Sequence, residues 1–249
     1  MEAMTDVLFW GSAGAIFIAS FLKGTLAIGF PLVATPLIAL LSDVPTAVVL
    51  SLVPNISMDI FQSFSRPWRR EDIHRLLPLI LAGVAGIQVG TKLLVTLSGP
   101  TLGLWLGLVV LAFAVSQLLP WKLSVPRSNL TLWSAAVGAV SGVVGGMTNV
   151  FTPVAIFFYA VGMDKATFVQ SVGATFLVFK MTQVVTTYHF ALWTPALATL
   201  ALPLTGIALL GFWCGRHIHT RLPERAFRQG VLLAISVAGV SLVLRSLSQ

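Results

Sequence analysis

The chain has 249 residues, of which 57% are hydrophobic and 9% are charged. An average soluble domain carries about 25% charged residues, so this composition excludes an ordinary water-soluble fold. Lys and Arg exceed Asp and Glu by 15 to 8, and the single cysteine, Cys214, excludes an internal disulfide and a cysteine metal cluster.

Apolar runs of about 16 to 22 residues recur from end to end, and a bilayer-spanning helix needs about 20. The sequence therefore predicts one all-α polytopic membrane domain over residues 1–249. In chain order the runs are residues 7–22, 31–41, 46–64, 76–97, 101–120, 132–144, 153–161, 167–188, 193–214 and 229–247.

Two pairs of runs are unusual because their members are short and a Gly-containing segment separates them. At 1.5 Å per residue, pieces of about 9 to 16 residues are mostly too short to cross about 30 Å of hydrocarbon. We expect each pair to be a broken, re-entrant hairpin of half-helices, although two full crossings would give the same topology. The separating segments are residues 23–30 and 145–152.

The two halves resemble each other at a spacing of about 120 to 123 residues, which is a common sign of a transporter built from repeats. Each half has one broken hairpin followed by three transmembrane helices, so repeat one covers about residues 7–120 and repeat two about 130–247. An odd number of spans per half makes the repeats inverted. The matching pairs are Gly24 and Gly146, Pro31 and Pro153, Trp10 and Trp133, Ser51 and Ser171, and Gln62 and Gln183.

Most positive charge lies in short loops at residues 66–75 and 216–228, with Lys122 and Arg127 in another. The hairpin topology places all three loops on one face, as the positive-inside rule requires, with both termini outside the cytoplasm. Basic clusters beside apolar spans have this explanation, so we predict a lipid bilayer as partner and no nucleic acid.

The two breaks are the best candidates for a binding site, because non-helical backbone at membrane depth occurs only where protein buries it or it lines a cavity. Pro31 and Pro153 suit the first turn of the helix after each break. The N-termini of these helices would present free N–H groups and partial positive charge, so the site favours an anion. The predicted binding residues are Lys23, Gly24, Thr25, Gly29, Gly145, Gly146, Thr148 and Asn149.

Three ionisable residues stand inside the spans, where charge is costly. Lys23 contacts the substrate or neutralises a carboxylate. Asp59 and Lys180 are 121 residues apart and form a pair with each other, or Asp59 pairs with Lys23, or Asp59 is the carboxylate that couples transport to protons. The neighbouring side chains expected to line the cavity are Asn55, Gln62 and Gln183.

Enzymatic signals are poor, because the sequence has no HExxH, G-x-S-x-G or P-loop motif and no pair of ligands at helical spacing in a span. We therefore predict no catalytic residues, no metal and no cofactor.

Residues 21–37, FLKGTLAIGFPLVATPL, followed by DVPTA at 43–47, resemble the Gly-rich first helix pair of the TauE/SafE sulfite exporter family. Residues 138–153, with Gly142, Gly145 and Gly146, are similar to the second Gly-rich motif of that family. The resemblance covers nearly the whole chain in length, span count and two-fold repetition. It departs from the family at Lys23, where a small residue is more usual and where a fixed positive charge would strengthen anion binding.

The resemblance implies a secondary transporter of small sulfur-containing anions, such as sulfite, sulfoacetate or other organosulfonates, across the bacterial inner membrane. We expect alternating access around an anion held at the two breaks, with Lys23 supplying charge and Thr25, Thr148 and Asn149 supplying hydrogen bonds. An anion channel and a non-transporting membrane subunit are the alternatives. Proton coupling, transport direction and a homodimeric assembly are left open.

Overall fold

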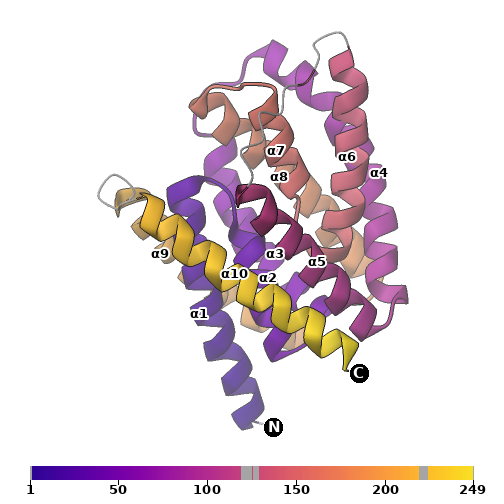
Figure 1. The fold of residues 1–249 in the computed structure, drawn as a ribbon, viewed down its shortest axis with the longest axis vertical. Helices are drawn as coiled ribbons and strands as arrows, with labels where there is room; N and C mark the ends of the chain where they lie inside the picture. Colours follow the sequence, from indigo (N-terminus) through magenta and orange to yellow (C-terminus); the bar gives the residue numbers. More distant parts are fainter. Residues whose placement is uncertain (1, 119–124, 126–128, 219–223, 249) are drawn as a thin grey trace. The chain divides into compact units, whose positions relative to one another are not determined.

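The computed structural model describes residues 2–118, 125, 129–218 and 224–248. The described residues form helices and no strand, and each predicted run corresponds to one helix (Figure 1). The helices are α1 (Glu2–Leu26), α2 (Phe30–Leu41), α3 (Val44–Ser63), α4 (Arg70–Thr96), α5 (Gly99–Leu118), α6 (Leu130–Thr148), α7 (Thr152–Ala160), α8 (Lys165–His189), α9 (Pro195–Ile218) and α10 (Glu224–Leu247).

Seven of the described helices are long and apolar enough to cross a membrane, namely α1, α3, α4, α5, α6, α8 and α9. The surface carries the large apolar side chains that lipid would cover. Leu81, Leu202 and Leu233 are each at least 66% exposed, for example. Many exposed apolar side chains of this size would be a liability in water, so length, hydropathy and surface agree on a multi-pass membrane protein.

The two interruptions are shorter than the sequence predicts. The first lies between α1 and α2 at residues 27–29, and the second lies between α6 and α7 at residues 149–151. Helix α1 continues to Leu26 and offers a 21-residue span, and α6 continues to Thr148 over 19 residues. The first member of each pair is therefore long enough to cross a membrane, whereas α2 and α7 are short, with 12 and 9 residues.

The physical reason for this difference is that Gly24, Gly145 and Gly146 allow close packing and do not end a helix. A Cβ atom on Gly24 would overlap the backbone carbonyl of Phe212, and one on Gly146 would lie 2.7 Å from the carbonyl oxygen of Ile87. The left-handed residues come a few positions later, at Ala27 (φ 66°), Gly29 (φ 104°) and Asn149 (φ 62°). Those residues, and not the three glycines, redirect the chain.

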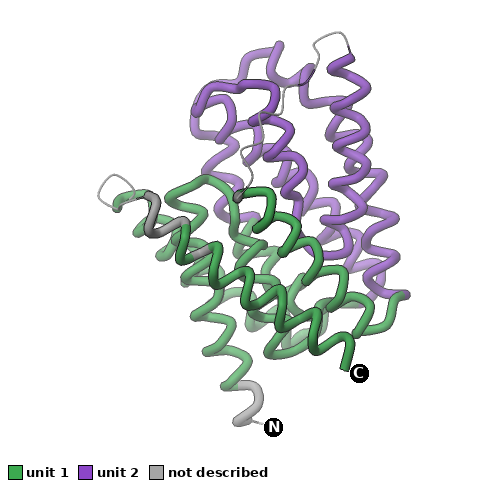
Figure 2. The backbone as a smooth tube through the Cα atoms, viewed as in Figure 1, with its two compact units in different colours: residues 1–55, 97–120, 192–249 green, residues 56–96, 121–191 purple. Residues whose placement is uncertain are grey.

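The chain divides into two compact units, which are coloured separately in Figure 2. Unit 1 comprises residues 1–55, 97–120 and 192–249. Within it, α1 packs against α2 and α9, and α10 packs against α5 and α2. Figure 1 shows α10 running beside α5. The buried face of α2 includes Phe30, Val33 and Ile38.

Unit 2 comprises residues 56–96 and 121–191, and α3 contributes its first part to unit 1 and its last part here. Helix α4 packs against α6 and α8, and α7 packs against both α6 and α8.

Arg66, from the predicted basic loop, fixes one end of α8. Its guanidinium donates to Gln170 Oε1 at 2.6 Å and to the Thr167 hydroxyl at 2.9 Å, and it pairs with Asp72 at 3.3 Å.

Each unit contains a tight helix interface in which a glycine meets the backbone of the facing helix, and residues of these two interfaces correspond. In unit 1, Gly24 of α1 faces Phe212 of α9; in unit 2, Gly146 of α6 faces Ile87 of α4. The α1 and α6 positions differ by 122 and the α9 and α4 positions by 125. The same offsets relate two further close pairs, Phe21 with Gly215 and Val143 with Gly90.

Helix α8 begins with a side-chain cap on its exposed end. The Asp164 carboxylate accepts hydrogen bonds from the backbone N–H groups of Ala166 and Thr167, both at 3.1 Å, and from the Thr167 hydroxyl. These donors favour the ionised carboxylate, so they lower the pKa of Asp164 below its ordinary value of 3.8, with the Thr167 hydroxyl as the largest cause.

Replacing Asp164 with Asn should therefore change the acid sensitivity of the protein. A lowered pKa means that the stabilisation from Asp164 is complete above pH 3.8 and is lost as the pH falls through the folded-state pKa. We expect the unfolding temperature of Asp164→Asn in detergent to fall less than that of the wild type between pH 5 and pH 3 (roughly the window set by the Asp pKa). If the unfolding temperatures of the two proteins fell equally with pH, this role for the cap would be contradicted.

Candidate functional site

Lys23 lies in the last turn of α1, where the positive charge complements the negative end of the helix. The side chain is 2% exposed. Its Nζ atom donates to Asn55 Oδ1 at 2.6 Å and lies 3.5 Å from the backbone oxygen of Asn55. Asn55, predicted to line a cavity, is itself fully buried. The structure thus keeps an ammonium inside unit 1, just before the first interruption.

The other residues predicted at the first interruption have mainly local roles. The Thr25 hydroxyl donates to the carbonyl oxygen of Leu22 at 2.8 Å, one turn back in the same helix. Gly24 contacts α9, as described above. Gly29 is the N-cap residue of α2, and no side chain caps that helix through a hydrogen bond. The first turn of α2 begins at Phe30 and has Pro31 near its start, as predicted.

Asn149 is the residue that ends α6. Its backbone N–H donates to the carbonyl oxygen of Gly145 at 2.6 Å, and its left-handed conformation is one that Asn tolerates better than most residues. The neighbouring Thr148 hydroxyl donates to Val144 at 2.7 Å and accepts from the N–H of Val150 at 3.3 Å. Both residues therefore shape the second interruption.

Gln183 binds the same helix end from α8. Its amide Nε2 donates to the carbonyl oxygens of Gly145 and Gly146, at 3.1 and 3.0 Å. The last carbonyls of a helix have no partner within the helix, so the amide satisfies groups that would otherwise be unpaired. The sequence predicts Gln183 as a cavity-lining residue, and in the structure it anchors the end of α6. Gln62, another predicted lining residue, is 4% exposed and lies against Gly173 of α8.

Asp59 and Lys180 form an ion pair inside unit 2, with Nζ and Oδ2 2.8 Å apart and both side chains fully buried. The Lys180 ammonium also lies 4.5 Å from the ring centre of Phe176 and 5.5 Å from that of Phe151. Aromatic faces attract a cation, and the attraction is stronger without water. Because Phe151 belongs to the second interruption, Lys180 brings the ion pair into contact with that interruption.

The aromatic neighbours of Lys180 were not anticipated from the sequence. Phe176 could have been found, because it precedes Lys180 by four residues and shares its helix face. Phe151 could not, because its contact depends on how α7 folds back against α8. Among the described residues, no three His, Cys, Asp or Glu side chains come together in a way that could hold a metal ion.

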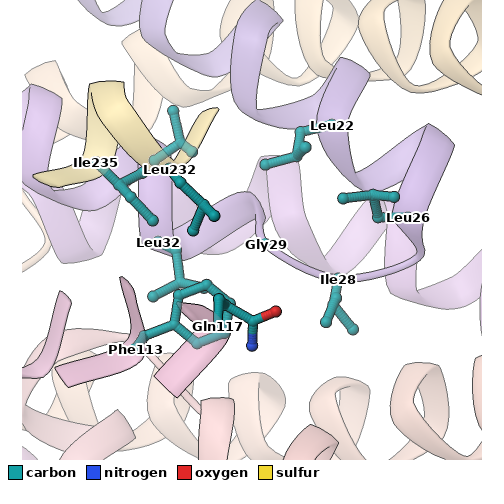
Figure 3. Close-up of a pocket in the computed structure, with 10 residues that line it drawn as sticks. Leu22, Leu26, Ile28, Gly29, Leu32, Phe113, Gln117, Leu232 and Ile235 are labelled. Carbon is teal, nitrogen blue, oxygen red and sulfur yellow. The ribbon is translucent and has the colours of Figure 1, made fainter. Parts of the chain in front are cut away.

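A cavity of about 200 Å³ lies in unit 1 at the first interruption (Figure 3). Its walls come from α1, α2, α5 and α10 and from the interruption itself. Gly29 is the one predicted binding residue among the ten that line it. Gln117 of α5, for which the sequence carries no signal, is the polar side chain of the lining, and Figure 3 shows its amide directed towards Ile28.

Comparisons with known proteins give one match. No curated protein and no solved structure matches the chain. The family model described as sulfite exporter TauE/SafE matches residues 12–242, which is nearly the whole chain and agrees with the resemblance carried by the Gly-rich segments. The chain therefore belongs to the TauE/SafE sulfite exporter family of membrane transporters.

Proposed function

We propose that the protein is a secondary transporter that moves small sulfur-containing anions, such as sulfite, sulfoacetate or other organosulfonates, across the bacterial inner membrane. The observation that carries this proposal is the buried Lys23 ammonium at the first interruption. A cation inside an apolar span is costly and marks a functional site by default. The family to which the chain belongs favours a sulfur-containing anion as the substrate.

Helix ends support an anion as the substrate in both units. In unit 1, the N-terminus of α2 follows Lys23 by a few residues and has no side-chain cap. In unit 2, α7 begins at Thr152 after Phe151, again with no side chain that caps its N–H groups. Free N–H groups and the helix dipole favour negative charge at such ends. We propose these groups as anion ligands within each unit, alongside Lys23 in unit 1 and alongside Thr148 and Asn149 in unit 2.

The matched interfaces support the proposed inverted repeats. Two helix pairs related by constant offsets of 122 and 125 residues are the pattern that duplication of a five-helix segment would leave. In each case the first helix of one half packs on the fourth helix of the other, α1 on α9 and α6 on α4. Relative movement of such repeats is a common basis of alternating access. We propose that transport proceeds in this way.

The test is uptake of radiolabelled sulfite or sulfoacetate into proteoliposomes. Lys23→Met keeps the length of the side chain and removes its charge, and Asn149→Gly removes the amide while permitting the left-handed backbone. We expect each variant to lower the transport efficiency by about tenfold to a hundredfold, the usual effect of losing a hydrogen bond to a charged group. Lys92→Met is the matched control, because Lys92 is exposed.

Two results would contradict the proposal. Wild-type rates in both Lys23→Met and Asn149→Gly would defeat the assignment of the site. Absence of flux for every small anion would favour a non-transporting subunit. Counterflow of labelled sulfite driven by unlabelled sulfite, with a saturable rate, would separate a transporter from an anion channel.

A further inference from the structure

The side chains that line the cavity at the first interruption are mostly apolar. Eight of its ten lining residues have apolar side chains, and the remaining two are Gly29, which has none, and Gln117. An apolar cavity of about 150 Å³ stays dry and binds benzene. Among these side chains a bare sulfite ion would exchange water for few hydrogen-bond donors, which costs free energy. The apolar residues are Leu22, Leu26, Ile28, Leu32, Val33, Phe113, Leu232 and Ile235.

The edge of the cavity has a different chemistry. Gly29 lines it and is at the same time the N-cap of α2, so the uncapped first turn of that helix begins at the cavity wall. An anionic head group would be stabilised there by the helix N–H groups, while an attached apolar body would lie among the leucines. Figure 3 shows Gly29 between Leu22 of α1 and Leu32 of α2.

We propose that this cavity binds the apolar body of an organic anion, and that the preferred substrate carries about six to eight carbons on a small anionic head group. This inference rests on the proposed function, since the cavity adjoins one of the proposed anion-binding groups, the N-terminus of α2. The size follows from the volume, about 200 Å³, which is a third larger than a cavity that holds benzene. A phospholipid tail, which crosses half of a hydrocarbon core about 30 Å thick, is longer than such a group.

The test is competition between radiolabelled sulfite and a series of alkanesulfonates, from methanesulfonate to octanesulfonate, in proteoliposomes. Each buried methylene should strengthen inhibition by about fourfold. The gain should stop when the cavity is full, at about six to eight carbons. Leu232→Trp fills part of the cavity, so in this variant inhibition should stop increasing at shorter alkyl chains than in the wild type. Leu233→Trp is the matched control, because the neighbouring Leu233 is 68% exposed on the same helix.

A second measurement does not depend on transport. Hexanesulfonate should raise the unfolding temperature of the wild type and of Leu233→Trp in phosphatidylcholine nanodiscs, and should not raise that of Leu232→Trp. This shift would support the cavity as a binding site even if no anion were transported, in which case the proposed function alone would fail. Sulfite flux with inhibition that is independent of chain length, and no thermal shift, would overturn the inference and leave the proposed function standing.

An anionic lipid has the same general chemistry, with an anionic head and an apolar body, so the experiment includes that source. Nanodiscs that contain phosphatidylglycerol should leave the hexanesulfonate shift unchanged. If phosphatidylglycerol itself raises the unfolding temperature of the wild type but not of Leu232→Trp, and removes the hexanesulfonate shift, a lipid occupies the cavity and the inference is overturned.

Discussion

Removing either partner of the Asp59–Lys180 ion pair should be the most destabilising single change in the spans of unit 2. Both side chains are fully buried, so Lys180→Met leaves a carboxylate, and Asp59→Leu an ammonium, without its partner. Breaking a buried pair in this way typically costs about 3 to 5 kcal/mol, whereas replacing both charges with apolar side chains is often close to neutral. We expect the double variant to be more stable than either single variant.

Thermal unfolding in detergent, arranged as a double-mutant cycle, measures this coupling. Lys92→Met, at an exposed position, is the control for loss of a lysine. Additive effects of the two single changes would mean that the interaction between Asp59 and Lys180 contributes little to stability.

Transport by the double variant then separates the roles that the sequence leaves open for Asp59. Restored flux indicates a structural ion pair, and stable protein that no longer accumulates the anion in response to a pH gradient indicates proton coupling.

Gly24→Ala should have the second largest effect, through packing. A Cβ at Gly24 would overlap the carbonyl of Phe212, so α1 and α9 would have to separate. Overpacking of this kind costs about 1 to 3 kcal/mol. Gly14→Ala in the same helix is the matched control, because nothing lies within 4 Å of its Cβ position. There we expect a gain of about 0.5 to 1 kcal/mol from the better helix former.

The unfolding temperatures of the two alanine variants, measured side by side in detergent, test this prediction. Gly146→Ala should behave as Gly24→Ala does, because its Cβ position lies 2.7 Å from the carbonyl oxygen of Ile87. Equal stability of Gly14→Ala and Gly24→Ala would show that the α1–α9 interface tolerates an extra methyl group. The glycines of the predicted binding segments would then have to be explained by contact with the substrate alone.

The helices could be predicted from the sequence because hydropathy and span length determine them almost directly. Where each interruption begins could not. Gly24 and Gly146 permit both a bend and a close helix contact, and the choice depends on Phe212 and Ile87, which are far away in the chain. The sequence around each glycine does not show which distant helix will pack against it, so the predicted breaks are too long.

The candidate site was predictable to a similar degree. Charge inside a span is rare, so Lys23, Asp59 and Lys180 could be singled out from composition alone. Their partners required the fold, and the two Phe rings around Lys180 had no signal beyond helical spacing in one case. The cavity in unit 1 was the least predictable feature, because leucines from four helices look like any other lipid-facing or core leucines until the helices are assembled.

The pairing of α1 with α9 has a consequence for how the protein is made. Helix α1 leaves the ribosome long before α9, the helix that packs against Gly24, which begins at Pro195. During synthesis α1 therefore enters the membrane well before α9 is available to pack against Gly24. A chain truncated before Pro195 should be recognised by quality-control proteases, and the N-terminal half expressed alone should be degraded unless the C-terminal half is supplied in the same cell.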